Sequence, residues 1–154
     1  MITAYRLAKA KHAREPLSGN GSLEVGGRWH RKGGRIVYCA GSMSLAALEF
    51  FVHLPKVQSR LQLASVEVEI PDPVRIEMLD PGKLPARWHR VPPISETADL
   101  GADWLEEQRS AVLRVPSAIS RGEYNYLINP LHPEAAGIAV RAVLPYSYDS
   151  RMWK

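Results

Sequence analysis

The sequence predicts an α+β domain built on a compact mixed or antiparallel sheet. Many short segments have the composition of strands, two segments have the composition of helices, and the two kinds do not alternate regularly along the chain. The length of 154 residues suits one hydrophobic core, and the contents of 45% hydrophobic and 23% charged residues are ordinary for a globular protein. We therefore expect a single α+β domain over residues 1–154.

The N-terminal region is predicted to form two strands joined by a long polar loop. Ile2–Leu7 has the composition of a short opening strand. The residues that follow, through Gly27, are polar, basic and rich in glycine and serine, and a loop of this length within a compact domain is usually functional or disordered. Arg35–Ala40 has a nearly continuous apolar centre and predicts the second strand.

A helix should follow directly after the second strand. Gly41-Ser42 interrupts the strand, and either Ser42 or Ser44 can cap the helix through its hydroxyl oxygen. The helix should reach about Leu54, because Pro55 disfavours the helical conformation in the residue before it.

The middle of the chain predicts two more strands and an irregular segment. Leu63–Ile70 alternates between valine or isoleucine and polar residues, as in a strand with one exposed face. Val74–Leu79 is a second extended segment, placed after the turn Pro71-Asp72-Pro73. Residues 80–94 are rich in proline and should be irregular.

The last third of the chain predicts a second helix and three strands. Ser95 can cap a helix that reaches roughly Ser110, with acidic residues early and Arg109 late, as the helix dipole favours. The extended segments that follow are Ala111–Val115, Tyr124–Ile128 and Ile138–Leu144.

Charge is distributed unevenly along the chain. Residues 1–60 carry 10 lysines and arginines against 3 acidic residues, a net charge of +7, whereas the remainder carries 10 against 13, a net charge of −3. The basic part would attract a phosphate-bearing ligand or an acidic partner. A solvated basic surface without a dedicated partner explains the same bias equally well.

Composition also bears on location and on metal binding. No apolar run approaches the roughly 20 residues of a membrane span, and the N-terminus lacks the pattern of a secretory signal. A lone cysteine, Cys39, forms no internal disulfide, so we expect a cytoplasmic protein. The histidines are scattered without the spacing of a metal site, so no metal is expected.

One carboxylate stands out because its surroundings are apolar. Glu49 lies in the run from Ser44 to Leu54, where a charged group must find partners or cost several kcal/mol. Such positions are frequent for functional acids. The alternative is a structural contact with His53, one helical turn further on.

Five blocks of sequence occur in order and at sensible spacing, and together they cover nearly the whole chain. The blocks are Gly27–His30, Val37–Ala40, Leu48–His53, Val115–Ile119 and Asn125–Pro133. They resemble the RES-domain family, the toxins of RES–Xre toxin–antitoxin modules, whose name records an arginine, a glutamate and a serine.

The resemblance implies a fold, an activity and a partner. The fold would be similar to that of ADP-ribosyltransferases, NAD would be the substrate rather than a cofactor, and an Xre-type helix-turn-helix antitoxin would be the partner. Such a type II toxin degrades NAD by hydrolysis or phosphorolysis of the nicotinamide–ribose bond. Carried over by position, Arg28, Glu49 and Ser117 are the name-giving residues, Tyr38 matches the strand tyrosine, and Asn129 lies in the Asn-Pro block.

The chemistry of NAD cleavage fits one well-placed carboxylate. Nicotinamide departs as a neutral group, so no general acid is needed, and the task is to stabilise an oxocarbenium-like transition state. Glu49 can offset that positive charge and accept a hydrogen bond from a ribose hydroxyl. Arg28 can hold the pyrophosphate or an adjacent ribose oxygen through its planar fork, and Tyr38 offers an aromatic face to the nicotinamide.

The remaining site residues also have structural explanations. Ser117 could hold the ribose, orient Glu49 or simply end a strand. Asn129 before Pro130 is a common turn signal as well as a candidate substrate contact. Likewise, Tyr38 could be a packing residue and Arg28 a surface residue.

Three other functions remain open. A protein ADP-ribosyltransferase would use the same chemistry and pass ADP-ribose to a protein. A nucleic-acid-binding module would use the basic N-terminal part, and a partner-binding protein would use segment 80–94 or the aromatic tail at 146–154, whose Trp153 should dock on the domain or on another chain. We expect the antitoxin to cover the cleft between Arg28 and Glu49. A homo-oligomer within that complex is compatible with the sequence.

Overall fold

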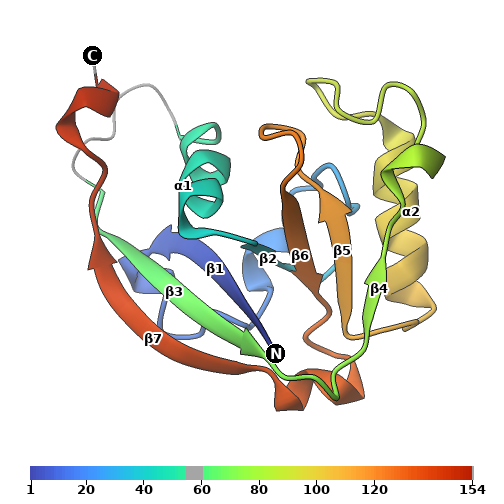
Figure 1. The fold of residues 1–154 in the computed structure, drawn as a ribbon, viewed down its shortest axis with the longest axis horizontal. Coiled ribbons are helices and arrows are strands. Elements are labelled where there is room, and N and C mark those ends of the chain that lie inside the picture. The colour runs from blue at the N-terminus through green and yellow to red at the C-terminus, as the bar shows by residue number, and fades with distance from the viewer. Residues whose placement is uncertain (55–60, 154) are drawn as a thin grey trace.

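The computed structural model describes residues 1–54 and 61–153, and in them the chain forms a seven-stranded sheet with the order β4-β5-β6-β2-β1-β3-β7 (Figure 1). Neighbouring strands run antiparallel except β4 and β5, which are parallel. This mixed sheet confirms the predicted α+β class. The strands are β1 (Ile2–Lys9), β2 (Val37–Ala40), β3 (Leu63–Ile70), β4 (Ile76–Met78), β5 (Val112–Pro116), β6 (Tyr124–Ile128) and β7 (Ala139–Tyr146).

Two α-helices accompany the sheet within the described residues, α1 (Met43–Phe51) and α2 (Ser95–Glu106). In this part of the chain no helix is long and apolar enough to cross a membrane. The shorter 3-10 helices are Ala10–His12, Asn20–Ser22, Pro81–Lys83, Pro133–Gly137 and Ser150–Trp153.

Helix α1 begins at one of the two caps that the sequence offers. The Ser42 hydroxyl oxygen accepts a hydrogen bond from the Leu45 N–H at 3.1 Å, so Ser42 is the N-cap. The helix ends at Phe51, three residues earlier than predicted. The Leu54 N–H donates to the carbonyl of Phe51, three residues earlier, rather than to the carbonyl four residues earlier as in an α-helix. Pro55, the predicted stop, lies outside the described residues.

Helix α2 differs from the prediction at both ends. Ile94 occupies the N-cap position, and Ser95 is already the first helical residue. The helix ends at Glu106 rather than near Ser110 because Gln108 adopts a left-handed conformation with φ of 49°. The Arg109 N–H then donates to the Trp104 carbonyl, five residues earlier. In helix ends of this type, the left-handed position is usually occupied by glycine.

Two predicted strands are shorter than their apolar segments, whereas one alternating strand agrees with its pattern. Strand β2 starts at Val37 rather than Arg35 because the Ile36 N–H donates to the Ser22 hydroxyl in the long loop. Strand β4 occupies only Ile76–Met78 of the predicted Val74–Leu79. In β3, the alternating aliphatic residues are buried and their polar neighbours are half-buried, which confirms the predicted alternation.

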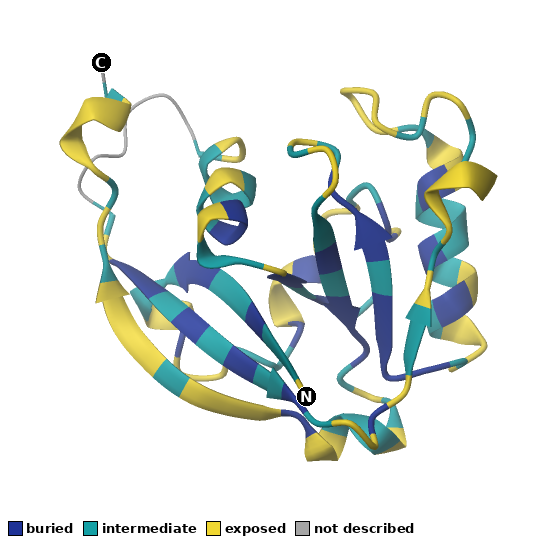
Figure 2. Ribbon diagram, viewed as in Figure 1, coloured by how far each residue is buried: buried dark blue, intermediate teal, exposed yellow. Residues whose placement is uncertain are grey.

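Both helices pack on the same face of the sheet. Ala40, Asn125 and Val115 stand opposite one another on β2, β6 and β5, so their side chains share that face. Ala40 packs with α1 through Leu45, and Val115 packs in the cluster that contains Trp104 of α2. The buried stripes of the central strands in Figure 2 run between the two helices. This arrangement leaves the ends of β5 and β6 between α1 and α2.

Helix α2 also holds the loop that carries Arg28. Gly101 faces the backbone of Trp29 so closely that a Cβ atom at position 101 would lie 1.7 Å from the Trp29 carbonyl oxygen. Glycine at this position therefore permits the close approach of helix and loop.

The C-terminal aromatic residues pack against α1. Trp153 and Tyr148 lie 5.6 Å and 5.5 Å from the Phe51 ring between centroids, and the Tyr148 hydroxyl donates to the Ala47 carbonyl at 2.5 Å. Trp153 thus docks on the domain, as one of the two predicted alternatives has it. The outermost turn of α1 is held by residues about a hundred positions later in the chain.

Candidate active site

Glu49 on α1 is held by two side chains from the β5–β6 end of the sheet. Its Oε1 atom accepts hydrogen bonds from the Ser117 hydroxyl at 3.1 Å and from the Asn125 side-chain nitrogen at 2.8 Å. Figure 1 shows α1 and the β5–β6 turn rising at the same end of the sheet. The half-buried carboxylate therefore has the partners that its apolar surroundings require, and they come from the sheet rather than from His53.

Ser117 lies in the turn after β5, with only 2% of its surface exposed. Its oxygen accepts hydrogen bonds from the N–H groups of Ile119 and Ser120, at 3.2 Å and 3.1 Å. Because these bonds occupy the oxygen, the hydroxyl proton is directed to Glu49. This geometry suits a residue that orients the carboxylate, which is one of the three roles that the sequence leaves open for Ser117.

Arg28 is anchored by the proline-rich segment that the sequence predicts to be irregular. Its Nη1 atom donates to the carbonyl oxygens of Trp88 and Arg90, at 2.7 Å and 2.9 Å. Burial lowers the pKa of the Arg28 guanidinium, and the negative charge of Glu49 opposes that shift. Arg28 is therefore a half-buried, oriented cation within electrostatic range of Glu49, not a free surface residue.

Tyr38 on β2 forms a short hydrogen bond with His30 of the long loop. The Tyr38 hydroxyl lies 2.5 Å from Nδ1 of His30, whose Nε2 faces the carbonyl oxygens of Val25 and Ser22 at 2.9 Å and 3.1 Å. Carbonyl oxygens only accept, so we assign the imidazole proton to Nε2, and Tyr38 then donates to Nδ1.

The phenol of Tyr38 stays protonated in this setting. Burial raises its pKa, while a backbone hydrogen bond from Trp29 and the charge of Arg28 act in the opposite direction and Glu49 adds to the rise. There is also little room beside the His30 ring, since a Cβ atom at Gly27 would lie 2.8 Å from it. Glycine is therefore the residue that fits at position 27.

Asn129 lies apart from the group around Glu49. It follows the other end of β6 from Asn125, and four residues of extended strand span about 13 Å. Its side-chain oxygen accepts from the Leu131 N–H at 3.0 Å, the pattern of a turn-forming asparagine. The structure does not bring Asn129 together with Glu49, and its role in substrate binding stays a prediction.

Sequence reasoning missed Asn125 and gave His30 no role. Asn125 opens the same block that contains Asn129, but nothing in the sequence shows that it lies next to a carboxylate 76 positions earlier. His30 belongs to the Gly27–His30 block, and its proximity to Arg28 is the one signal in the sequence that points to it.

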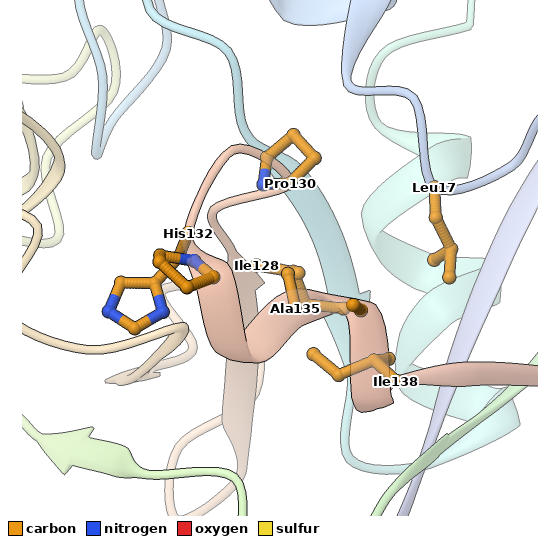
Figure 3. A pocket seen from close by; sticks show the side chains of 8 residues that line it. Leu17, Ile128, Pro130, His132, Ala135 and Ile138 are labelled. Atoms are coloured by element: carbon orange, nitrogen blue, oxygen red, sulfur yellow. The ribbon is translucent and has the colours of Figure 1, made fainter.

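A groove of about 610 Å³ lies between the proline-rich segment and the β5–β6 turn. Ser117, which bonds to Glu49, and Trp88, whose carbonyl holds Arg28, both line it. A second hollow of about 340 Å³ lies between Leu17, Ile128 and Ile138 and includes His132 (Figure 3). None of the predicted site residues lines this second hollow, so the first groove is the one associated with the candidate site.

Comparisons with known proteins identify relatives along nearly the whole chain. A family profile described as "RES domain" matches residues 3–149. A protein named "Prs ADP-ribosylating toxin" from Sphingobium sp. is 44% identical over 140 residues, which are 90% of this chain and 87% of that protein. A "Toxin Res" from Photorhabdus laumondii is 39% identical over 151 residues, 97% of this chain and 96% of that protein.

A solved structure shares the fold. One chain of the crystal structure of the M. tuberculosis MbcT-MbcA toxin-antitoxin complex superimposes with a TM-score of 0.77, covering 95% of this chain and 84% of that chain. The sequence identity is 17%, so this likeness concerns the fold alone.

Proposed function

The chain belongs to the RES-domain family, and on that premise we propose that it is the toxin of a toxin–antitoxin module that breaks the bond between nicotinamide and ribose in NAD. The observation that carries this proposal is the Glu49 carboxylate, set in an apolar helix, held by two donors and within electrostatic range of an oriented arginine.

The proposed reaction uses the charge of Glu49. As the C–N bond breaks, its electron pair leaves with nicotinamide, which becomes neutral, and the ribose ring gains positive charge. A fixed carboxylate next to that ring stabilises the charge, and it does so more strongly where water is excluded. An oxygen of the acceptor then bonds to the ribose carbon, and the acceptor's proton is released.

The other residues of the site bind the substrate in this proposal. Arg28 has further N–H groups on the same planar fork for the pyrophosphate, in addition to the pair of bonds made by Nη1. Tyr38 offers its ring to the nicotinamide, and Ser117 orients Glu49. Asn129 would contact a more distant part of the dinucleotide. NAD is the substrate here, and the proposal requires no separate cofactor or metal.

The test is NAD consumption by the purified protein. We expect Glu49→Gln, which keeps the shape of the side chain and removes its charge, to lower the turnover rate by at least roughly 100-fold, the scale of losing one electrostatic stabiliser. Glu67→Gln on β3 is the matched control, because β3 supplies none of the side chains or carbonyl groups that are hydrogen-bonded to Glu49 or Arg28. Equal turnover by wild type and Glu49→Gln would refute the proposed role of the carboxylate.

Transfer of ADP-ribose to a protein is a second candidate function, favoured by the name of the Sphingobium relative at 44% identity. Labelled NAD distinguishes the two functions. Label released as free ADP-ribose or its phosphorylated form means that water or phosphate is the acceptor. Label retained on a protein means transfer.

We further propose that an Xre-type antitoxin partners this protein in the cytoplasm and covers the cleft between Arg28 and Glu49. The fold shared with a chain of a toxin-antitoxin complex supports an antitoxin as the partner. Residues 1–154 would form one RES domain, which agrees with the single sheet of the described residues and with the match over residues 3–149. A purified complex with full NAD turnover would contradict a covered cleft.

A further inference from the structure

Asn125 occupies a position of the sheet that suits an apolar side chain. Its neighbours across the strands are Val115 on β5 and Ala40 on β2, both buried. Asn125 itself is only 9% exposed. A carboxamide placed there must give up its contacts with water, which costs folding free energy unless each polar atom finds a partner.

Only half of the Asn125 carboxamide is satisfied. Its nitrogen donates to Glu49 Oε1 at 2.8 Å, and the orientation is determined because an ionised carboxylate can only accept. The carboxamide oxygen is consequently buried without a hydrogen-bond partner among the described residues. An unsatisfied buried acceptor requires an explanation, and a functional role is one of the few available.

We propose that Asn125 is a positioning residue that holds Glu49 for catalysis at the expense of stability, an inference that rests on the proposed function. Asn125 and Ser117 both donate to Oε1, so together they fix the rotation of the carboxylate. The other oxygen, Oε2, is then the one that faces the ribose. Asn125 acts through Glu49 and makes no contact with NAD itself.

The consequence is an unusual combination of effects on substitution. Asn125→Ala removes the unsatisfied oxygen along with the donor, so the thermal unfolding midpoint should stay the same or rise. The turnover rate kcat should fall by about 10-fold or more, because the carboxylate can rotate away from its productive orientation. KM for NAD should change by less than about 3-fold, because substrate contacts remain.

The experiment compares the full-length wild type, Asn125→Ala and Asn125→Asp for NAD turnover and thermal unfolding. Asn125→Asp keeps the shape but places a second carboxylate 2.8 Å from the first, so its kcat should fall at least as far as that of Asn125→Ala. In the Glu49→Gln background, Asn125→Ala should cause no further loss of the residual turnover, because its effect passes through the charge of Glu49.

The outcomes separate this inference from the proposed function. Four results for Asn125→Ala would overturn the positioning role alone. The first two are an unchanged kcat in an active protein and a rise in KM with kcat intact. The others are a fall of the unfolding midpoint that accompanies the loss of activity, and a full further loss of turnover in the Glu49→Gln background. Failure of the wild type to consume or transfer any part of NAD would overturn the proposed function, and the inference with it.

Discussion

The bonds around Glu49 replace water with fixed donors. A carboxylate on a solvent-exposed helix would reorganise its hydration as substrate charge develops, whereas the Ser117 hydroxyl and the Asn125 amide are held in place by the turn after β5 and by the sheet. Donors that need not reorganise during the reaction are the main source of electrostatic catalysis in enzymes. At the scale of single residues, the candidate site would therefore be prepared for the proposed reaction before the substrate binds.

Cys39 on β2 gives a pH prediction, because it is a buried thiol. Burial raises its pKa to about 11, with the charge of Arg6 acting against that rise. The folded protein thus keeps the proton at pH values where the unfolded chain, with an ordinary thiol near 9, has released it. The stabilising contribution is present below pH 9 and is lost as pH rises toward 11, by an amount of up to about 3 kcal/mol.

Urea unfolding of wild type and Cys39→Ala between pH 7 and pH 10.5 checks this prediction. The difference in free energy of unfolding between the two proteins should shrink above pH 9, because Cys39→Ala has no thiol to titrate. Parallel curves for the two proteins across that range would contradict it.

The sequence predicted that Glu49 needs polar partners, but it did not predict both of the residues that supply them. A glutamate in an apolar run is conspicuous because its burial is costly, and Glu49 indeed has buried partners. Asn125 was missed because a strand asparagine is unremarkable until the sheet register places it beside Glu49. Asn129 was favoured over it through its motif, although the structure shows Asn129 bonded within a turn.

At the scale of elements, the close contact of α2 with the Arg28 loop makes a testable prediction. Gly101→Ala should destabilise the protein by about 1–3 kcal/mol, because its Cβ atom meets the Trp29 carbonyl and forces the loop away. This change opposes the gain of up to about 1 kcal/mol that alanine normally brings to a helix. Since Arg28 precedes Trp29, KM for NAD should rise as well.

Denaturant unfolding and NAD kinetics measure both effects, and Ala102→Gly serves as the control in the next helical position. It loses only helix propensity, so its KM should match that of the wild type. A Gly101→Ala variant with wild-type stability and KM would show that the loop moves freely relative to α2.

An element boundary could be predicted where the contact that sets it joins residues close in the sequence. The start of α1 was predictable because Ser42 bonds to a backbone N–H three residues away. The end of α2 was not, because Gln108 adopts the left-handed conformation that glycine usually marks. The start of β2 could not be predicted either, because the hydrogen bond from Ile36 to Ser22 that shortens this strand joins residues from separate parts of the loop.

At the scale of the whole molecule, the site draws its residues from both halves of the chain. The long loop and β2 supply Arg28 and Tyr38, α1 supplies Glu49, and the β5–β6 end supplies Ser117 and Asn125. The C-terminal aromatic residues then support α1 from the other side. The proposed catalysis should consequently depend on contacts far from the substrate.

Tyr148→Ala tests that dependence. The substitution removes the ring contact with Phe51 and the hydrogen bond to the Ala47 carbonyl, so it should loosen α1 and lower kcat. Relative to the wild type, amide hydrogen exchange should speed up more in α1 than in β3. Tyr148→Phe is the matched control, because it keeps the aromatic contact and loses only the hydroxyl, so its effect should be smaller. Unchanged exchange in α1 of Tyr148→Ala would show that the aromatic contacts do not support the helix.

The order in which these contacts become available has a consequence for synthesis. The partners of Glu49 at Ser117 and Asn125 follow it by 68 and 76 positions, and the Tyr148 contact with Ala47 spans 101 positions. A nascent chain on the ribosome therefore exposes Glu49 long before anything can hold it. The proposed activity would therefore require residues 117–125 to have left the ribosome, and the contact that supports α1 would form only after Tyr148 has followed them.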